Sequence, residues 1–186
     1  LTEASFSWDP KSPEPVLKDI NLQIDSGKLT MILGGVGAGK SSLLAAILGE
    51  MHKRQGAVLW KGGAVVAFVP QEPWILNATV EENILFGLPK DEKRYQRVIQ
   101  ACSLQPELEI LPMGDMTEIG DTSINLSAGQ QQRISLARAM YSHADVIVMD
   151  DPFTALDLHA GGHVFQDGIL NFLLRRKRTV LLSTYE

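Results

Sequence analysis

The stretch Gly34-Gly35-Val36-Gly37-Ala38-Gly39-Lys40-Ser41, at residues 34–41, is a glycine, four variable residues and then Gly-Lys-Ser. This pattern is typical of a phosphate-binding loop, in which glycines allow backbone N–H groups to surround phosphate oxygens. Residues 29–33 predict a buried strand before the loop, and residues 42–48 predict a helix after it. That order predicts a nucleotide site at the positive end of the helix. An ordinary glycine-rich turn would match by chance in about one such chain in a hundred.

Further groups of a nucleotide site follow from the residue types. In such a loop the lysine, here Lys40, reaches the β- and γ-phosphates, and the hydroxyl of Ser41 is a ligand of Mg²⁺. A metal-binding acid is also expected at the end of a buried strand. The apolar run at residues 146–149 ends at Asp150, which makes Asp150 the candidate. An aspartate that only caps its strand is the alternative, which the loop upstream disfavours.

The composition is that of an ordinary globular domain. Apolar residues make up 45% and charged residues 21% of the 186 residues, enough for one domain with its own core. The net charge of −5 argues against a nucleic-acid-binding face. No apolar run approaches the about 20 residues of a membrane span. The one cysteine, Cys102, cannot form an internal disulfide, so a reducing compartment is expected.

Strand patterns come first along the chain and helical patterns follow. Residues 16–24 alternate polar and apolar side chains, and residues 57–60 predict a short strand after a polar stretch. Helical patterns dominate from residue 80 to residue 141 and indicate an inserted subdomain, with the best helix at residues 128–141. Strands that alternate with helices after a phosphate-binding loop predict an α/β fold with a doubly wound parallel sheet.

A third motif, Leu126-Ser127-Ala128-Gly129-Gln130, begins the helix predicted at residues 128–141. It resembles LSGGQ, the signature sequence of ATP-binding-cassette (ABC) nucleotide-binding domains. The loop, this motif and Asp150 occur in the order of that family's Walker A, signature and Walker B motifs, and the likeness covers nearly the whole chain. The resemblance implies a P-loop NTPase with a RecA-like, mostly parallel sheet, an N-terminal antiparallel β subdomain and an inserted α-helical subdomain.

The resemblance implies a single cassette with three regions. Residues 1–75 would hold the antiparallel β subdomain and the P-loop core, residues 76–141 the helical subdomain with the signature, and residues 142–186 the Walker B core. Family members usually continue with another strand and helices, so we expect this cassette to be truncated at its C-terminus.

The resemblance also implies roles for single residues, with ATP and Mg²⁺ as the cofactors. Trp8 matches the aromatic residue that stacks on adenine, with Phe6 as the second choice. Gln71 matches the Q-loop glutamine, which contacts Mg²⁺ and the attacking water. The implied Mg²⁺ ligands are Ser41, Gln71 and Asp150. The other implied ATP contacts are the Walker A residues Gly34, Gly35, Val36, Gly37, Ala38, Gly39, Lys40, Ser41 and Ser42.

The partners implied are a second nucleotide-binding domain, in a head-to-tail dimer, and the transmembrane domains of a transporter. The signature residues would act in trans on ATP held by the second domain, and they are Ser127, Ala128, Gly129 and Gln130. Residues 155–157, Ala-Leu-Asp, resemble the D-loop of the dimer interface. The Q-loop at Gln71 lies where the transmembrane domains of the family make contact.

Three positions depart from the family pattern. The catalytic glutamate is Asp151 here, whose carboxylate reaches about 1.5 Å less far, and errors of about 1 Å can cost about 10²-fold in rate. The histidine after the last strand is Tyr185, a neutral hydrogen-bond donor. Ala128 replaces a signature glycine and would weaken the partner's site. The implied catalytic residues are Asp151, Gln71 and Tyr185, and we expect a site that binds ATP and hydrolyses it slowly or not at all.

Asp150 to Phe153 and the context of Trp8 resemble the first cassette of ABC subfamily C. Stretches that resemble sulfonylurea receptors in particular lie at residues 29–32, 48–51, 77–84 and 101–106. That likeness implies a nucleotide sensor for a potassium channel pore subunit, at the cytoplasmic face of the plasma membrane. The segment at residues 54–69 is shorter than in those receptors, which keeps an ATPase motor of a multidrug-resistance-associated exporter as the alternative. A soluble ABC ATPase of DNA repair or translation is disfavoured. The long coiled coil of the repair type does not fit between Lys40 and Leu126, and the translation type usually carries two cassettes and a basic linker.

Overall fold

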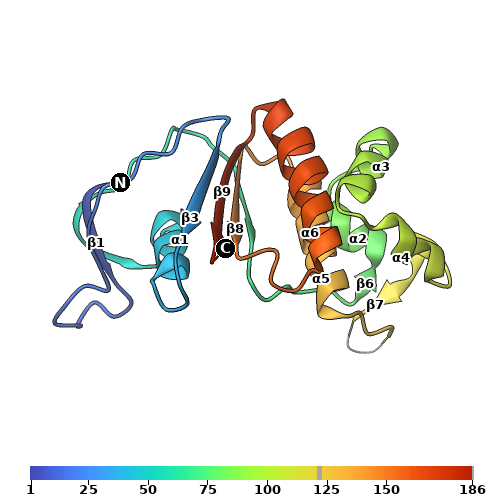
Figure 1. Cartoon of the computed structure of the whole chain (residues 1–186), viewed down its shortest axis with the longest axis horizontal. Coiled ribbons are helices and arrows are strands. Elements are labelled where there is room, and N and C mark those ends of the chain that lie inside the picture. The colour runs from blue at the N-terminus through green and yellow to red at the C-terminus, as the bar shows by residue number, and fades with distance from the viewer. Residues whose placement is uncertain (121–122, 186) are drawn as a thin grey trace.

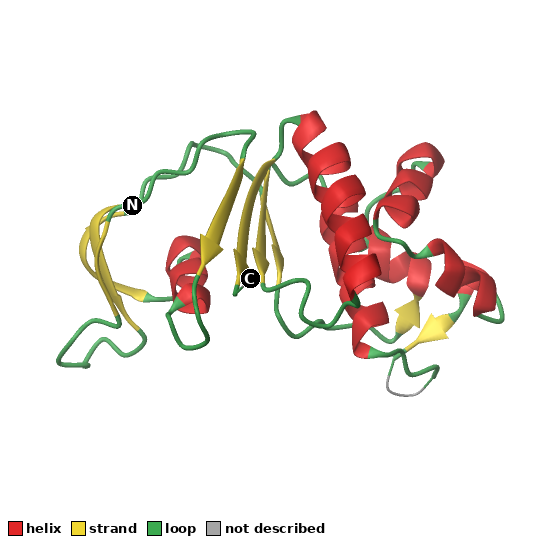
Figure 2. Ribbon diagram, in the orientation of Figure 1, coloured by secondary structure: helices red, strands yellow, loops and turns green. Residues whose placement is uncertain are grey.

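A computed structural model of the chain describes residues 1–120 and 123–185. A parallel sheet and helix α1 (Lys40–Leu48) lie between an antiparallel sheet at one end of the molecule and a group of helices at the other (Figures 1 and 2). This is the predicted α/β architecture, with a parallel central sheet, an N-terminal antiparallel sheet and inserted helices.

The parallel sheet positions the predicted nucleotide site. Its strand order is β3-β9-β8-β5, and the strands are β3 (Leu29–Leu33), β5 (Val66–Val69), β8 (Val146–Asp150) and β9 (Thr179–Thr184). Leu33 pairs with Thr184, and Asp150 pairs with Ser183. Because the strands are parallel, the loops that follow them meet at one edge of the sheet, where ligands of open α/β sheets bind.

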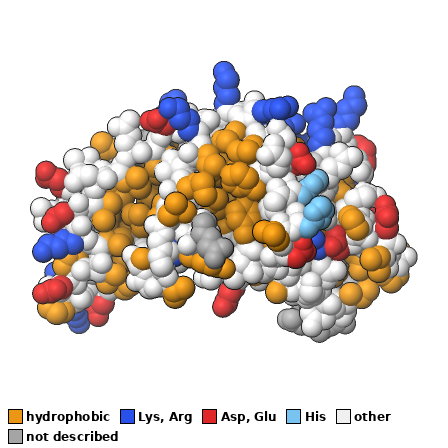
Figure 3. Space-filling view, in the orientation of Figure 1, with side chains coloured by type: hydrophobic (Ala, Val, Ile, Leu, Met, Phe, Trp, Pro, Cys, Tyr) orange, Lys and Arg blue, Asp and Glu red, His pale blue; other side chains and the backbone are white. Residues whose placement is uncertain are grey.

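Strand β3 is confirmed at residues 29–33, but the prediction that it is buried is wrong. It lies at the edge of the sheet with β9 as its neighbour, and the side chains of Met31 and Leu33 are 43% and 64% exposed. Figure 3 shows hydrophobic side chains gathered over the middle of one face of the molecule. An apolar run therefore predicted the strand correctly but could not tell an edge strand from a central one.

The antiparallel sheet has the order β2-β1-β4 and consists of β1 (Thr2–Ser7), β2 (Leu17–Ile20) and β4 (His52–Ala57). The strand predicted at residues 57–60 is wrong, because β4 is the polar segment before it, selected by its pairing with β1. At Gly56 φ is 76°, and a Cβ there would lie 2.3 Å from the Glu3 carbonyl oxygen. Only glycine fits where the two strands approach so closely.

The subdomain predicted at residues 76–141 consists of helices and one short strand pair. Its elements are β6 (Ala78–Thr79), α2 (Val80–Leu85), α3 (Glu92–Ala101), α4 (Gln105–Ile110), η1 (Gly114–Met116), β7 (Glu118–Ile119) and α5 (Ala128–Tyr141). After β8, helix α6 (Leu158–His163) continues into a π-helix, η2 (Val164–Leu173), and a 3-10 turn, η3 (Leu174–Arg176). Within the described ranges, no helix has both the length and the apolar character needed to cross a bilayer.

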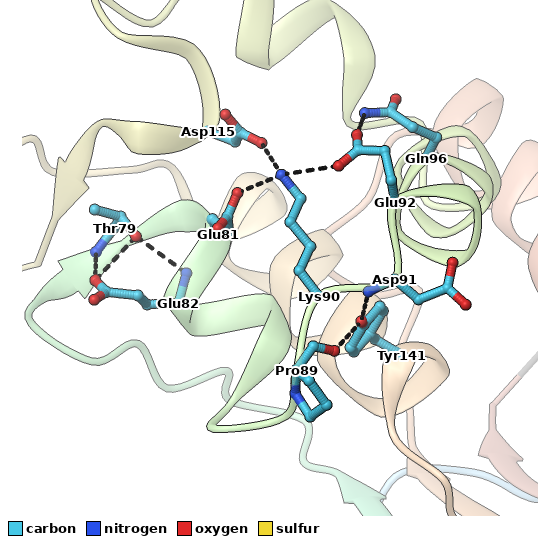
Figure 4. Close-up of polar contacts among 10 residues, drawn as sticks. All are labelled: Thr79, Glu81, Glu82, Pro89, Lys90, Asp91, Glu92, Gln96, Asp115 and Tyr141. Atoms are coloured by element: carbon cyan, nitrogen blue, oxygen red, sulfur yellow. Dashed lines mark hydrogen bonds and ion pairs between the residues drawn. The ribbon is translucent and has the colours of Figure 1, made fainter.

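Lys90 and Tyr141 fix the segment between α2 and α3 (Figure 4). The Lys90 ammonium lies 2.6 Å from a Glu81 oxygen, 3.3 Å from Glu92 and 3.8 Å from Asp115. Its hydrogen bond to Glu81 is the main reason that the pKa of Lys90 is raised. The Tyr141 hydroxyl donates to the Pro89 carbonyl at 2.7 Å and accepts the Asp91 N–H at 2.8 Å. These contacts hold α2, α3 and α5 together around the insert's core.

Candidate nucleotide-binding site

The glycine-rich loop lies between β3 and α1. Gly37 and Gly39 have φ values of 80° and 89°, which other residues rarely adopt, and a Cβ on Gly35 or Gly37 would meet no protein atom within 4 Å. The Lys40 ammonium donates to the carbonyl oxygens of Gly34 at 2.7 Å and Gly35 at 3.1 Å, inside the turn. The Lys40 ammonium and the N–H groups at the start of α1 are donors for phosphate oxygens, and the open space around the loop leaves room for a phosphate chain.

Asp150 and Asp151 lie at the same edge of the sheet, and each is 8% exposed. Asp150 ends β8, and its Oδ1 accepts a 2.5 Å hydrogen bond from the Ser183 hydroxyl of β9. The Asp151 carboxylate oxygen Oδ1 is buried and has no hydrogen-bond partner among the described residues. Carboxylate and hydroxyl oxygens are the ligands that Mg²⁺ prefers, so Ser41 and Asp150 fit that ion chemically.

Asp151 and Tyr185, the predicted counterparts of the family's catalytic glutamate and histidine, lie beside one hollow. Both line this hollow, with Met31, Phe153 and Phe165 among the other lining residues. Tyr185 directly follows β9, and its side chain is 47% exposed. The two predicted departures therefore lie close together, at the ends of β8 and β9.

The remaining predicted ATP contacts come from other strands. Gln71 is exposed and closely follows β5. It lies at the same edge of the sheet as Asp150, because Val69 at the end of β5 pairs with Met149 of β8. Phe6 is 1% exposed and belongs to the core under β1, whereas Trp8 is 52% exposed. The structure thus leaves Trp8, rather than Phe6, free to contact a nucleotide. Val36, Ala38 and Ser41 are exposed along the loop, and Ser42 is half-buried.

The signature residues begin α5, on the opposite side of the parallel sheet from α1 (Figure 1). The Ser127 hydroxyl accepts the Gln130 N–H at 3.3 Å, and the Gln130 side chain accepts the Ser127 N–H at 2.9 Å, which forms a capping box. Ser127 and Ala128 are exposed. A Cβ on Gly129 would lie 2.8 Å from the Ala155 carbonyl oxygen, so the D-loop packs directly on the signature helix of the same chain.

Two buried polar residues of α5 escaped the sequence analysis. The Gln132 amide donates to the Pro70 carbonyl at 3.5 Å, next to Gln71. The Arg138 guanidinium donates to the Asn83 carbonyl at 2.8 Å and its Oδ1 at 2.9 Å, and lies 3.7 Å from the centre of the Trp74 ring. Burial lowers the pKa of Arg138 to about 10, so it remains charged at neutral pH. The available clue was an arginine between the apolar residues Ala137 and Ala139 of α5.

Comparison with known proteins identifies one family. A family model described as "ABC transporter" matches residues 17–154. The chain is 50% identical over 205 residues to ATP-binding cassette sub-family C member 8 of Homo sapiens, which covers 97% of the chain and 13% of that protein. It is 51% identical over 184 residues to sub-family C member 2 of Mus musculus, covering 98% of the chain and 12% of that protein. ABC transporter C family member 13 of Oryza sativa subsp. japonica is 50% identical over the whole chain, which spans 12% of its length.

Replacing Gly129 with alanine tests the contact between the signature helix and the D-loop. The added methyl would press on the Ala155 carbonyl, and overpacking of this kind typically costs about 1–3 kcal/mol in the free energy of unfolding, measured by urea denaturation. The matched control is Gly162→Ala in α6, where a Cβ meets no atom within 4 Å, so that alanine should stabilise the helix by about 1 kcal/mol. Equal effects of the two substitutions would contradict the contact.

Replacing Arg138 with methionine tests whether this guanidinium holds the segment after the Q-loop. Buried acceptors on Asn83 would lose a charged donor, which costs about 1.5–3 kcal/mol of unfolding free energy. Hydrogen exchange of the Leu76 amide, which donates to Asn83 Oδ1 at 2.8 Å, should speed up at the same time. Arg97→Met is the control, because the described part of the chain gives exposed Arg97 no hydrogen bond or ion pair. If the Leu76 amide exchanged at the same rate in Arg138→Met and Arg97→Met, the role of Arg138 in holding this segment would be refuted.

Proposed function

Since the chain belongs to the ABC transporter family, in subfamily C, we propose that it is a cassette that binds Mg-ATP, hydrolyses it slowly and couples its nucleotide state to transmembrane domains. The main support is the meeting of the glycine-rich loop, Asp150, Asp151 and Tyr185 at one edge of the sheet. The chain spans only 12–13% of these relatives, so the role of the whole protein is part of the proposal.

Binding would use groups that the fold already places. Lys40 would exchange its bonds to the loop carbonyls for bonds to phosphate oxygens, while loop N–H groups bind the same phosphates. Trp8 would stack on the adenine. Mg²⁺, held by Ser41, Gln71 and Asp150, would neutralise phosphate charge when it is bound.

Slow hydrolysis would follow from the two substituted positions. Asp151 places a carboxylate at the family's catalytic position, but its side chain is one methylene too short, and its Oδ1 is buried. Tyr185 can donate a hydrogen bond but carries no positive charge near neutral pH. A water molecule would then be bound without the group that normally orients or activates it.

Binding is tested with Lys40→Ala in the full-length protein. The loss of a charged hydrogen bond to phosphate should weaken ATP binding about tenfold to a hundredfold, measured as equilibrium binding at this cassette. Lys53→Ala is the control, because Lys53 lies exposed on β4. Unchanged affinity for Lys40→Ala would remove this loop from the nucleotide site.

Hydrolysis is tested by restoring the family's residues. Asp151→Glu returns the missing methylene, and we expect phosphate release at this cassette to rise at least about tenfold, with a further rise when Tyr185→His is added. Asp151→Asn should change the already slow rate little. Fast wild-type turnover that Asp151→Asn abolishes would overturn the proposal of a slow site.

The contact with transmembrane domains is proposed at the apolar surface beside the Q-loop. Trp74 and Phe86 are 43% and 53% exposed, and their rings meet edge to face at 5.5 Å. Arg138 contacts both rings and lies on the same helix as the signature. Exposed aromatic side chains held by a buried network suit a protein interface. This location would place the partner domain next to groups that move with the nucleotide.

Two uses of the nucleotide state remain in this proposal. One is a sensor that acts on a potassium channel pore subunit, from the likeness to sulfonylurea receptors. The alternative is the ATPase motor of an exporter. The segment at residues 54–69, which is shorter than in those receptors, is the observation that supports the exporter as the alternative. Measuring substrate transport in vesicles and channel current in response to Mg-nucleotides would distinguish the sensor from the motor. In either function the cassette would lie at the cytoplasmic face of a membrane.

A further inference from the structure

Ser183 contacts both acids of the site from a buried position on β9. Its hydroxyl donates to Asp150 Oδ1 at 2.5 Å. The Asp151 N–H donates to the Ser183 carbonyl at 3.0 Å and approaches its hydroxyl oxygen at 3.1 Å. The Ser183 side chain is 0% exposed, so no water competes for these contacts.

The hydroxyl proton of Ser183 can serve only one acceptor. The Asp151 amide supplies its own hydrogen, so the hydroxyl accepts on that side and directs its proton to Asp150. A short hydrogen bond to a carboxylate is charge-assisted and about twice as strong as a neutral one. It fixes the plane of the Asp150 carboxylate and engages Oδ1, which leaves the other oxygen for a further partner.

The backbone of Asp151 depends on the same residue. Its φ of 44° lies in the left-handed region, which residues with a Cβ rarely adopt. Its N–H has both acceptors of Ser183 within hydrogen-bond distance, which offsets part of the cost of that conformation. Ser183 therefore holds the carboxylate of Asp150 and the backbone of Asp151, the two residues at the strand end.

We propose that Ser183 is a positioning residue of the nucleotide site, which acts through Asp150 and the Asp151 amide and makes the binding of Mg²⁺ with ATP tighter. This inference rests on the proposed function of the sheet edge. A serine that only fills space in β9 would affect the stability of the fold without affecting the dependence of binding on Mg²⁺. That difference makes the two roles separable.

The test is a matched pair of variants in the full-length protein, Ser183→Thr and Ser183→Val. Threonine and valine have nearly the same shape and both suit a buried strand, but only threonine keeps the hydroxyl. The measurement is ATP binding at this cassette as a function of free Mg²⁺, with binding in EDTA as the reference. Ser183→Ala removes the hydroxyl without added volume and serves if the larger side chains do not fold.

We expect Ser183→Thr to match the wild type, and Ser183→Val and Ser183→Ala to need about tenfold to a hundredfold more Mg²⁺ for half-saturation. Binding in EDTA should be the same in all of them. Equal Mg²⁺ requirements for Ser183→Thr and both hydroxyl-free variants would overturn the role of Ser183 but not the proposed function. A wild type that binds no ATP at this cassette would overturn the proposed function, and this role with it.

Discussion

The parallel register of β3, β9, β8 and β5 is the constraint on which the site depends. It sets Leu33 beside Thr184 and Asp150 beside Ser183, so that residues far apart in the sequence end at one edge. A slip of one residue would turn the Asp150 side chain to the other face of the sheet and separate it from the Ser183 hydroxyl. Buried apolar residues on β8 and β9 oppose such a slip because it would expose or misplace them.

Helix α5 is the second organising element, because it connects three parts of the cassette. Its first turn packs on the D-loop through Gly129, its middle contacts the Q-loop through Gln132, and Arg138 near its end binds Asn83 and Trp74. A rigid helix transmits a displacement from one end to the other with little loss. In the proposed function, a partner that closes on the signature would thereby also affect the surface at Trp74.

Local patterns predicted the elements that depend on neighbouring residues. The glycine-rich loop, β3 and the bounds of α5 follow from residue types within a few positions, and the structure has all three. Long-range pairing was not predictable in the same way, so β4 was missed, since only its partner β1 makes its polar residues a strand. Ser183 and Arg138 were missed for the same reason, because their partners come from other strands and helices.

In the proposed function, this site keeps bound ATP intact for longer than a typical cassette takes to hydrolyse it. The most direct test incubates the full-length protein with ATP and Mg²⁺, removes free nucleotide, and identifies the bound nucleotide that is absent from a Lys40→Ala variant. Retained ATP is the predicted result. Rapid conversion of that nucleotide to ADP would contradict the claim.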